Sequence, residues 1–502
     1  MTVLRYIFVL LEVILLFNLL IAVHELGHFL AAKWRGLKID RFAIWFGKPI
    51  WKRKIGGVEY ALGCIPAGGY VALPQMATME IIEGKSGKPE KTVEVPWHDF
   101  PAGGTSDTEH PEEVLPNVSA LDKIIVAFAG PLFSFLLAIA FAFVVWGVGR
   151  PSNETDNTTM IGWADPDGPA WKAGLRPGDT ILEIDGHPVN HFFPTAAGGL
   201  HQGLQDSINW RIITSEGTNI AIKYLRDGHE QMAYATVYHR PTEWYERKAL
   251  RQILINPAMK ALVDEVASNS PAALAGLTNG DEILALNGQN IYSPQAIVSA
   301  ENAMSNGPVR PLALTIRHGN ETFDRTLLAI RPVQPTNSNP SLGILAWGEE
   351  TNFMLVHPRP LDQIQASVGQ IYGTLHALFA HKSEIGVQQL GGAVMIIRVY
   401  SNLFESDDGW RRVLWFSVIL NVNLALINLL PLPVLDGGHI LLSLLEVVRR
   451  RPVSAKLLNS IQTSFAVLLI GFMVYIAFFD TGDWVRSARD NRDVPIVFAT
   501  HR

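Results

Sequence analysis

The chain has 502 residues, too many for one ordinary domain, and its length suggests about three units. Hydrophobic residues make up 48% of the chain, a high share for a soluble protein of this size, which indicates membrane segments. The net charge of −6 provides no basic field that would attract nucleic acid, so no nucleic-acid partner is expected. The single cysteine, Cys64, excludes intramolecular disulfides and multi-cysteine zinc sites. A metal site would therefore need histidine and carboxylate ligands.

Four apolar stretches are long enough to cross a bilayer, which takes about 20 helical residues. They cover residues 6–32, 124–149, 413–435 and 461–479. The first stretch is longer than the apolar core of a cleaved signal peptide, and no convincing cleavage site precedes Lys33, so we interpret it as a membrane helix. The sequence thus predicts a multi-pass α-helical protein in a lipid bilayer.

Basic residues indicate how these helices are oriented. Eight of them follow the first span, namely Lys33, Arg35, Lys38, Arg41, Lys48, Lys52, Arg53 and Lys54. Three more, Arg449, Arg450 and Arg451, lie between the third and fourth spans. By the positive-inside rule both loops are cytoplasmic, which places residues 150–409 and both termini on the outer side.

The outer region contains an internal repeat. "PAWKAGLRPGDTILEIDG" (169–186) and "PAALAGLTNGDEILALNG" (271–288) match at 10 of 18 positions with a constant offset of 102 residues. Each copy predicts a short helix, a glycine turn, an apolar strand and a tight turn. The shared pattern A-G-L-x-x-G-D-x-I-L resembles the PDZ domain, so two tandem PDZ-like α+β domains are expected.

Two other segments have a distinct composition. Residues 75–118 are rich in proline, glycine and acidic residues, which is typical of a flexible insert, here on the cytoplasmic side. Residues 361–382 carry apolar residues at helical spacing, which predicts an amphipathic helix near the membrane surface.

The strongest chemical motif lies at the end of the first span. His24-Glu25-Leu26-Gly27-His28 fits H-E-x-x-H, and residues i and i+4 of a helix share one face, so both imidazoles can reach one metal ion. Zinc suits two histidines and an oxygen ligand, and Glu25 is placed to take a proton from water. Buried, hydrogen-bonded histidines are the alternative. It is disfavoured because ionisable groups in a membrane helix are costly without a function.

Asp436 in "NLLPLPVLDGGH" is the best third metal ligand. Pro431 and Pro433 break the third span there, and irregular backbone at membrane depth is tolerated only where it is buried in protein or lines an aqueous cavity. Two alternatives remain open. Asp436 would otherwise cap a helix that begins near Gly437, and His439 is a rival ligand.

Together, H-E-x-x-H in the first span, "AGP" at 129–131, the paired repeats and "NLLPLPVLDGGH" resemble the site-2 protease family of intramembrane zinc metalloproteases. The resemblance covers essentially the whole chain in order. It implies that His24, His28 and Asp436 bind Zn²⁺ and that Glu25 is the general base. It also implies a single-pass membrane protein as substrate, already shortened by another protease. In bacteria, that substrate is typically a membrane anti-sigma factor.

The resemblance also suggests residues that bind substrate. "CIPAGGYV" (64–71) is similar to the family's membrane-associated β-loop, so Gly68 and Gly69 are expected to help hold substrate as an added strand. Asn423 and Asn428 match asparagines near the active site, where an amide side chain would grip unwound backbone. The structural alternative is that the glycines only make a turn and the asparagines satisfy a broken helix.

Some positions depart from the family pattern. Ser134 stands where many relatives have asparagine, and "LGGAV" (390–394) lacks the usual proline after its second glycine. The acidic insert is also longer than expected. None of these departures removes a metal ligand, so they concern substrate handling.

The predicted organisation is a first transmembrane helix with β-loop (1–74), a cytoplasmic insert (75–120), a second transmembrane helix (121–149), PDZ-like domains (150–248 and 249–345), a linker with an amphipathic helix (346–409), two further transmembrane helices (410–480) and a tail (481–502). The predicted activity is zinc-dependent hydrolysis of a peptide bond within a membrane segment. The family resemblance implies a bacterial inner membrane, with the PDZ-like pair in the periplasm. Alternatives are a non-catalytic PDZ scaffold and a metal transporter.

The PDZ-like pair would bind a newly cut carboxyl end or form a steric gate. The gate is favoured because no clear glycine-rich carboxylate loop is visible, with "ILINP" (253–257) in its place.

Overall fold

The computed structural model describes most of the chain. It covers residues 2–74, 118–152, 155, 157–193, 206–305, 307–335, 338–348, 354–380, 383–406, 408–449, 455–490 and 496–499. The predicted insert at 75–118 lies almost entirely outside the described residues. The chain forms two compact units, one from Met1–Val148 with Gly392–Phe478 and the other from Gly149–Gly391 with Phe479–Arg502.

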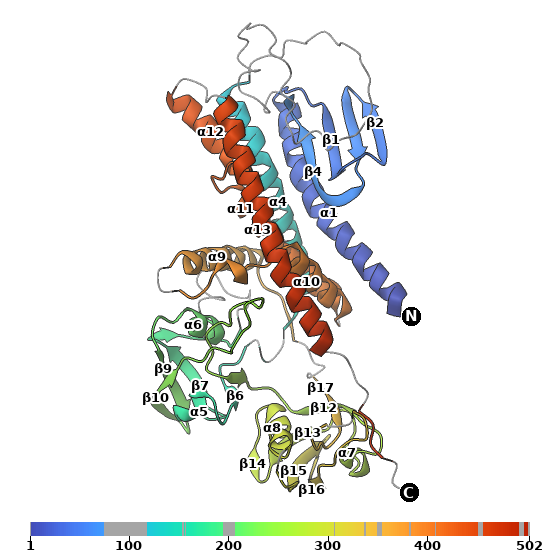
Figure 1. Cartoon of the computed structure of the whole chain (residues 1–502), viewed down its shortest axis with the longest axis vertical. Coiled ribbons are helices and arrows are strands. Elements are labelled where there is room, and N and C mark those ends of the chain that lie inside the picture. The colour runs from blue at the N-terminus through green and yellow to red at the C-terminus, as the bar shows by residue number, and fades with distance from the viewer. Residues whose placement is uncertain are drawn as a thin grey trace. The chain divides into compact units, whose positions relative to one another are not determined.

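The first unit is mainly helical (Figure 1). Its helices are α1 (Thr2–Trp34), α4 (Ala120–Val148), α10 (Ala393–Glu405), α11 (Gly409–Asn428), α12 (Asp436–Arg449) and most of α13 (Ala455–Asp490). Within the described residues, four helical segments are long and apolar enough to cross a membrane: Ile7–Trp34, Ala120–Val148, Gly409–Asn428 and Ser460–Arg489. The expectation of four membrane-spanning helices is therefore confirmed.

Helix α4 is the centre of this bundle, since α1, α11 and α12 all pack against it. At the N-terminal part of α1, Val9 and Val13 are buried with Tyr400 of α10 and Val413 of α11. The Tyr400 hydroxyl lies 3.0 Å from the Ser417 hydroxyl, so this buried phenol has a polar partner.

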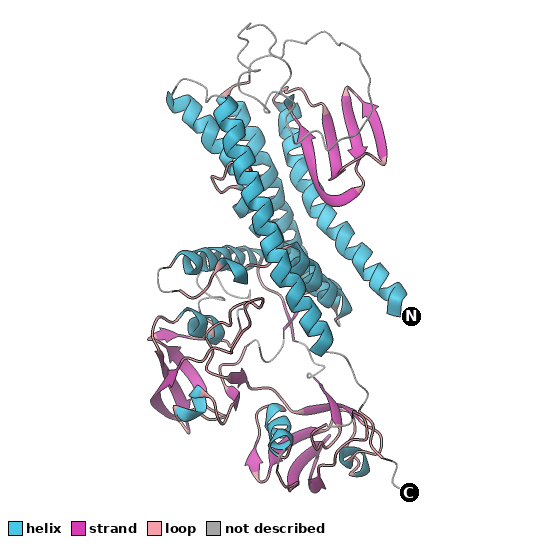
Figure 2. Ribbon diagram, viewed as in Figure 1, coloured by secondary structure: helices cyan, strands magenta, loops and turns pink. Residues whose placement is uncertain are grey.

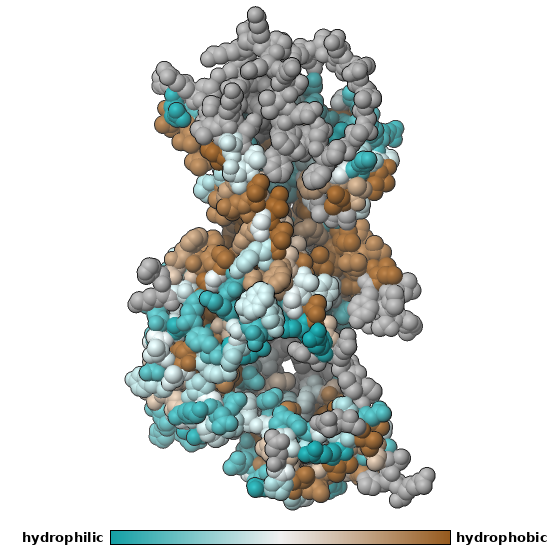
Figure 3. Space-filling view, viewed as in Figure 1, coloured by the Kyte–Doolittle hydropathy of each residue, from teal (hydrophilic) through white to brown (hydrophobic). Residues whose placement is uncertain are grey.

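Apolar side chains remain exposed on the outer faces of these helices, as Figure 3 shows over α1 and the neighbouring bundle. On α1, for example, Phe8 and Leu15 are 62% and 68% exposed. Large apolar side chains left open in this way are costly in water and favourable in lipid, which fits helices that face a bilayer.

Two helix ends differ from the predicted spans. The third apolar stretch is predicted to run to residue 435, but α11 ends at Asn428 because the proline-containing segment that follows cannot continue the helix. The fourth is predicted to end at 479, whereas α13 continues to Asp490 through a polar sequence. Hydropathy detects the apolar part of a helix and not the solvated turns that extend it.

A four-stranded sheet follows α1 in the same unit. Its strands are β1 (Arg41–Phe46), β2 (Trp51–Ile55), β3 (Val58–Leu62) and β4 (Ile65–Ala72), in the order β2-β3-β1-β4. Strand β4 pairs antiparallel with β1 and packs against α1. Phe29 of α1 contacts the rings of Phe42 and Tyr60, which anchors the sheet to the helix. Its position makes β4 an edge strand beside α1 (Figure 2).

The second unit contains two larger sheets, each with its own core, and two short two-stranded sheets in its described residues. In the first, the order is β10-β9-β7-β8, and β11 pairs with β6. The elements are β6 (Ile161–Ala164), α5 (Pro169–Lys172), β7 (Thr180–Ile184), β8 (His187–Pro188), α6 (Ile208–Thr214), β9 (Asn219–Arg226), β10 (His229–Thr236) and β11 (Ile255–Pro257). Fully buried isoleucines such as Ile181, Ile208 and Ile222 form its core.

The second sheet has the order β16-β15-β13-β12-β17, with β14 paired to β13. The elements are β12 (Leu262–Val266), α7 (Pro271–Leu274), β13 (Glu282–Leu286), β14 (Gln289–Asn290), α8 (Gln295–Ala303), β15 (Pro311–His318), β16 (Glu321–Leu328) and β17 (Ile344–Gly348). Both 18-residue repeats thus form a short helix followed by a strand, β7 in one copy and β13 in the other. The presence of sheet domains and membrane-length helices in one chain confirms that part of the predicted fold class, and the PDZ assignment stays a prediction.

The remaining elements of this unit are β5 (Arg150–Ser152), β18 (Met354–Val356), α9 (Pro360–Phe379) and the 3₁₀ turn η2 (Val387–Gln389). Helix α9 lies in the region where the sequence predicts an amphipathic helix. The end of the chain contacts the second sheet domain, since Val497 pairs with Gln334 and Phe498 is buried beside Gly343.

Candidate metal centre

The H-E-x-x-H motif lies on α1, where the spacing of four residues places both histidines on one face. Nε2 of His24 and Nε2 of His28 are 3.3 Å apart, and the rings meet edge to face with their centroids 5.0 Å apart. Both side chains are largely buried. The two imidazoles therefore converge on a single point instead of extending into solvent.

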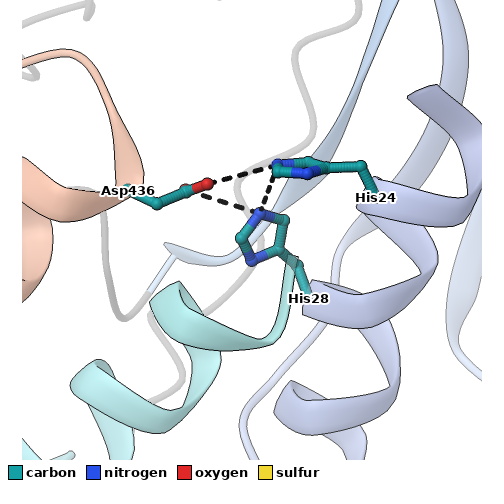
Figure 4. Close-up of side chains that lie close together, drawn as sticks. All are labelled: His24, His28 and Asp436. Carbon is teal, nitrogen blue, oxygen red and sulfur yellow. Dashed lines mark hydrogen bonds and ion pairs between the residues drawn. The ribbon is translucent and has the colours of Figure 1, made fainter. Parts of the chain in front are cut away.

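Asp436 reaches that point from the other end of the chain (Figure 4). Its Oδ2 lies 3.2 Å from Nε2 of His24, and its Oδ1 lies 3.4 Å from Nε2 of His28. The aspartate is the first residue of α12, directly after the broken segment that ends α11. The helix break expected from Pro431 and Pro433 is thus what brings the carboxylate to the histidines.

The two glycines after Asp436 make this approach possible. A Cβ on Gly437 would overlap the carbonyl oxygens of Leu429 and Leu430, and one on Gly438 would overlap that of Leu432. The broken segment folds back against the start of α12 with no room for a side chain. The D-G-G sequence is therefore a packing requirement of the site.

Helix α4 approaches the histidines equally closely. A Cβ on Gly130 would overlap Nε2 of His28 and lie 2.8 Å from Nε2 of His24. On α1, a Cβ on Gly27 would overlap the carbonyl oxygen of Ala129. These glycines, one in the metal motif and one in "AGP", let the backbones of α1 and α4 meet at the site.

The outer nitrogen of each imidazole has a hydrogen-bond partner on α4. Nδ1 of His28 lies 2.8 Å from the carbonyl oxygen of Val126, which only accepts, so the proton of this ring is on Nδ1. Nδ1 of His24 lies 2.9 Å from the hydroxyl of Ser134, which is fully buried. The carbonyl partner leaves Nε2 of His28 with a lone pair for the shared point. The Ser134 hydroxyl can accept from Nδ1 of His24, and in that tautomer Nε2 of His24 presents a lone pair there as well.

These three side chains fit a tetrahedral metal ion. One ligand atom from each residue lies within 4.8 Å of the other two. The two Nε2 atoms are 3.3 Å apart, and each lies near a different oxygen of Asp436, at 3.2 Å for His24 and 3.4 Å for His28. Donors about 2.0–2.1 Å from a tetrahedral centre are separated by about 3.3–3.4 Å, which is the spacing of the two nitrogens. An oxygen of Asp436 would be the third ligand, which leaves a fourth position open. Hydrogen-bond partners on the outer nitrogens of both histidines are likewise typical of metal-binding imidazoles.

A cavity of about 460 Å³ opens onto this group. His24, Glu25, His28 and Asp436 line it, together with residues 68–73 of the sheet and residues of α4, α11 and α12. Glu25 also accepts a hydrogen bond from the backbone of Val71 in β4. The edge strand therefore passes directly beside the carboxylate that the sequence singles out as the base.

The other predicted site residues are placed unequally. Asn428 lines the cavity, with Nδ2 3.4 Å from Nε2 of His24. Asn423 is not among the cavity-lining residues, although its buried Oδ1 has no hydrogen-bond partner in the described part of the chain. His439, the rival ligand, lines the cavity but lies outside the group of three ligands.

Gly68 and Gly69 also line the cavity, and their surroundings differ. Gly68 has a φ of +88°, and a Cβ there would overlap the ring of Phe46, so its conformation and packing both require glycine. A Cβ on Gly69 would lie 3.2 Å from Cγ of Glu25. A side chain at residue 69 would therefore crowd the side chain of Glu25.

Comparisons with known proteins agree over nearly the full length. The model of the family described as "Peptidase family M50" matches residues 12–472. The "Regulator of sigma E protease" of Haemophilus influenzae is 28% identical over 92% of this chain and 96% of its own length. The "Regulator of sigma-E protease RseP" of Salmonella typhimurium is 26% identical over 92% and 96%. A Vibrio cholerae protein named "Putative zinc metalloprotease" is 27% identical over 88% and 91%.

Proposed function

Since this chain belongs to peptidase family M50, we propose that it is a zinc endopeptidase that hydrolyses a peptide bond within the membrane segment of a single-pass protein. His24, His28 and Asp436 would hold the zinc ion, and Glu25 would act as the general base. The observation that carries this proposal is the convergence of three metal-ligand side chains beside a carboxylate on one cavity. The names of the relatives, which include zinc metalloprotease, support zinc as the cofactor.

When bound, zinc supplies Lewis acidity, which polarises the scissile carbonyl and makes water easier to deprotonate. Glu25 takes the proton from the attacking water and returns it to the nitrogen of the leaving amine. Its position on the cavity wall, outside the three-ligand group, leaves the carboxylate free for this role. The hydrogen bond from Val71 orients it.

Strand β4 would hold the substrate. A helical membrane segment must unwind before it is cut, and its freed backbone groups need immediate partners because lipid offers none. An edge strand supplies them by pairing with the unwound segment as an added strand. Residues 68–73 form the cavity wall beside Glu25, so a strand paired there would present its peptide bond to the base. Asn428 would hold the same backbone from the opposite wall.

The family resemblance and the relatives' names support a proposal for the substrate class. We expect an anti-sigma-factor-like single-pass protein that another protease has already shortened. The chain would sit in a bacterial inner membrane with the H-E-x-x-H end toward the cytoplasm and the two sheet domains in the periplasm. These domains would act as PDZ-like gates that exclude substrates with bulky outer parts.

A cleavage assay separates this function from its rivals. The purified chain is incubated with a panel of tagged single-pass proteins, with and without a zinc chelator, and the products are sized. We expect a cut within the membrane segment that disappears with the chelator and returns with zinc. Cleavage that ignores the chelator would contradict the proposal. A scaffold would give no products, and a transporter would give metal flux in proteoliposomes without products.

The contact between Ser134 and His24 gives a testable prediction about the metal. Ser134→Ala removes the partner of Nδ1, so His24 is less well oriented, and zinc affinity should fall by about 10–100-fold. Zinc retained against a series of competing chelators measures this directly. Ser417→Ala is the control, because Ser417 is equally buried and hydrogen-bonded but is not part of the site. Equal zinc retention in both variants would refute the role of Ser134.

A further inference from the structure

The second sheet domain has an edge on which another strand can add. Strand β17 is last in the sheet order and, among the described residues, pairs only with β12. Its outer edge therefore offers backbone donors and acceptors to an extended peptide. A peptide that pairs antiparallel to β17 has its carboxyl end beside the first residues of that strand. The loop at Ser341–Gly343, which leads into β17, is where a terminal carboxylate would arrive.

A carboxylate of the chain itself already occupies that loop. Oε1 of Glu301, on α8, accepts a hydrogen bond of 2.7 Å from the backbone N–H of Leu342. The same oxygen lies 3.3 Å from the hydroxyl of Ser341, which donates to it. The hydroxyl of Ser341 in turn accepts from the N–H of Gly343 at 3.0 Å. The donors that would receive a peptide's carboxyl end are thus satisfied from within.

Glu301 is held there without a compensating cation, since none of the ion pairs in the described part of the chain includes it. Burial raises the pKa of its carboxyl group, while the hydrogen bonds from Leu342 and Ser341 oppose this shift. A partly buried carboxylate whose partners are a backbone amide and a hydroxyl resembles a bound anion more than a surface side chain.

The first sheet domain lacks this arrangement. The bridges Tyr238–Gln252 and Ile330–Ser341 make Ile253 the counterpart of Leu342, and Leu254, with a φ of +57°, the counterpart of Gly343. Leu254 and Gly343 both have a positive φ, but in the described residues no side-chain carboxylate accepts from the N–H of Ile253. The internal carboxylate is therefore a feature of the second domain and not a requirement of the loop.

We propose that Glu301 is an internal plug, which occupies the loop before β17 and keeps the second sheet domain from binding peptides by a free carboxyl end. Without Glu301, the domain has a latent site for an extended peptide with a free C-terminus. This proposal does not depend on the protease activity. It explains how a domain with an open strand edge can serve as a gate without binding the carboxyl ends of unrelated proteins at that edge.

Peptide binding to the full-length protein in detergent tests the plug. The probe is a fluorescein-labelled decapeptide that ends in Ala-Val-Leu with a free carboxylate, and its C-terminal amide is the matched peptide. Glu301→Ala should bind the free acid roughly tenfold or more tightly than the wild type, as expected when a charge-assisted hydrogen bond becomes available. The amide should show no such gain. Glu321→Ala, which removes an exposed glutamate of the same domain, should behave like the wild type.

Glu301→Gln keeps the size of the side chain and guards against loss of folding in the alanine variant. It should strengthen binding of the free acid by a smaller factor, because a neutral amide competes less well for the Leu342 N–H. Two results would overturn the proposal. One is wild-type binding of the free acid as tight as in both Glu301 variants. The other is equal binding of the acid and amide peptides by those variants.

Discussion

Glu25→Gln is expected to leave the zinc content of the purified protein unchanged and to lower the rate of substrate cleavage by about 10²–10⁴-fold. Glutamine has nearly the same shape as glutamate but cannot take a proton from water at neutral pH. Glu25 lines the cavity but is not part of the three-ligand group, so the change should spare the metal. Elemental analysis of zinc and the initial rate on a tagged single-pass substrate measure the two quantities.

The matched control is Glu12→Gln, which makes the same substitution on the same helix, outside the residues that line the cavity. It should retain both zinc and cleavage. Cleavage that continues at the wild-type rate in Glu25→Gln would exclude Glu25 as the base. Loss of zinc in that variant would mean that the carboxylate helps to hold the metal.

Gly130→Ala should remove most of the bound zinc and lower cleavage by at least about 100-fold, the upper end of what a change next to metal ligands costs. The added methyl group would overlap Nε2 of His28 and lie 2.8 Å from Nε2 of His24, the two atoms that should face the metal. These atoms cannot move away easily, because each ring is held from behind by α4. Zinc content and cleavage rate are again the measurements.

Gly147→Ala tests whether the effect comes from the site or from the helix. Gly147 is also in α4, but a Cβ there meets nothing within 4 Å, so this variant should keep its zinc and its activity. A zinc-loaded, active Gly130→Ala protein would show that α4 does not approach the histidines as closely as the structure has it.

Much of the fold and of the metal centre can be predicted from the sequence alone, because the motifs that indicate them are local. The i, i+4 spacing of His24 and His28 needs only one helix turn to put both rings on one face. Pro431 and Pro433 predict a helix break from their own chemistry, whatever their distant contacts. The four apolar helices are confirmed for a similar reason, since hydropathy over about 20 residues depends on no distant contact. Asp436 is 412 residues from His24 in the sequence, so no local pattern shows that they meet. The family resemblance and the helix break together indicate their convergence.

What the sequence could not provide depends on contacts between helices. Ser134 appears in the sequence only as a departure from the usual asparagine, and nothing in the local pattern shows that its hydroxyl meets His24. "AGP" was visible as a motif, but only the close approach of α4 to α1 explains why Gly130 has no side chain. Asn423 and Asn428 look alike in the sequence, yet they are five residues apart on α11, and only Asn428 lines the cavity.

The same holds for the second sheet domain. Glu301 follows an apolar helical pattern and reads as an ordinary surface glutamate, because its partner at Leu342 lies 41 residues further along the chain. The expectation of a gate rested on the lack of a glycine-rich loop in "ILINP", which is the first domain. The second domain does have a glycine of positive φ at the equivalent position, Gly343. In that domain a gate is favoured for a different reason, because Glu301 already occupies the N–H of Leu342.

X-ray absorption at the zinc edge of the purified, zinc-loaded protein tests the metal centre most directly. We predict two imidazole nitrogens at about 2.0–2.1 Å and oxygen ligands at about 2.0–2.2 Å, with no sulfur. Replacing Asp436 by alanine should remove one oxygen ligand and weaken zinc binding, while the imidazole signal persists in whatever zinc remains. A wild-type spectrum without imidazole scattering, or one that Asp436→Ala leaves unchanged, would contradict a metal ion held by His24, His28 and Asp436.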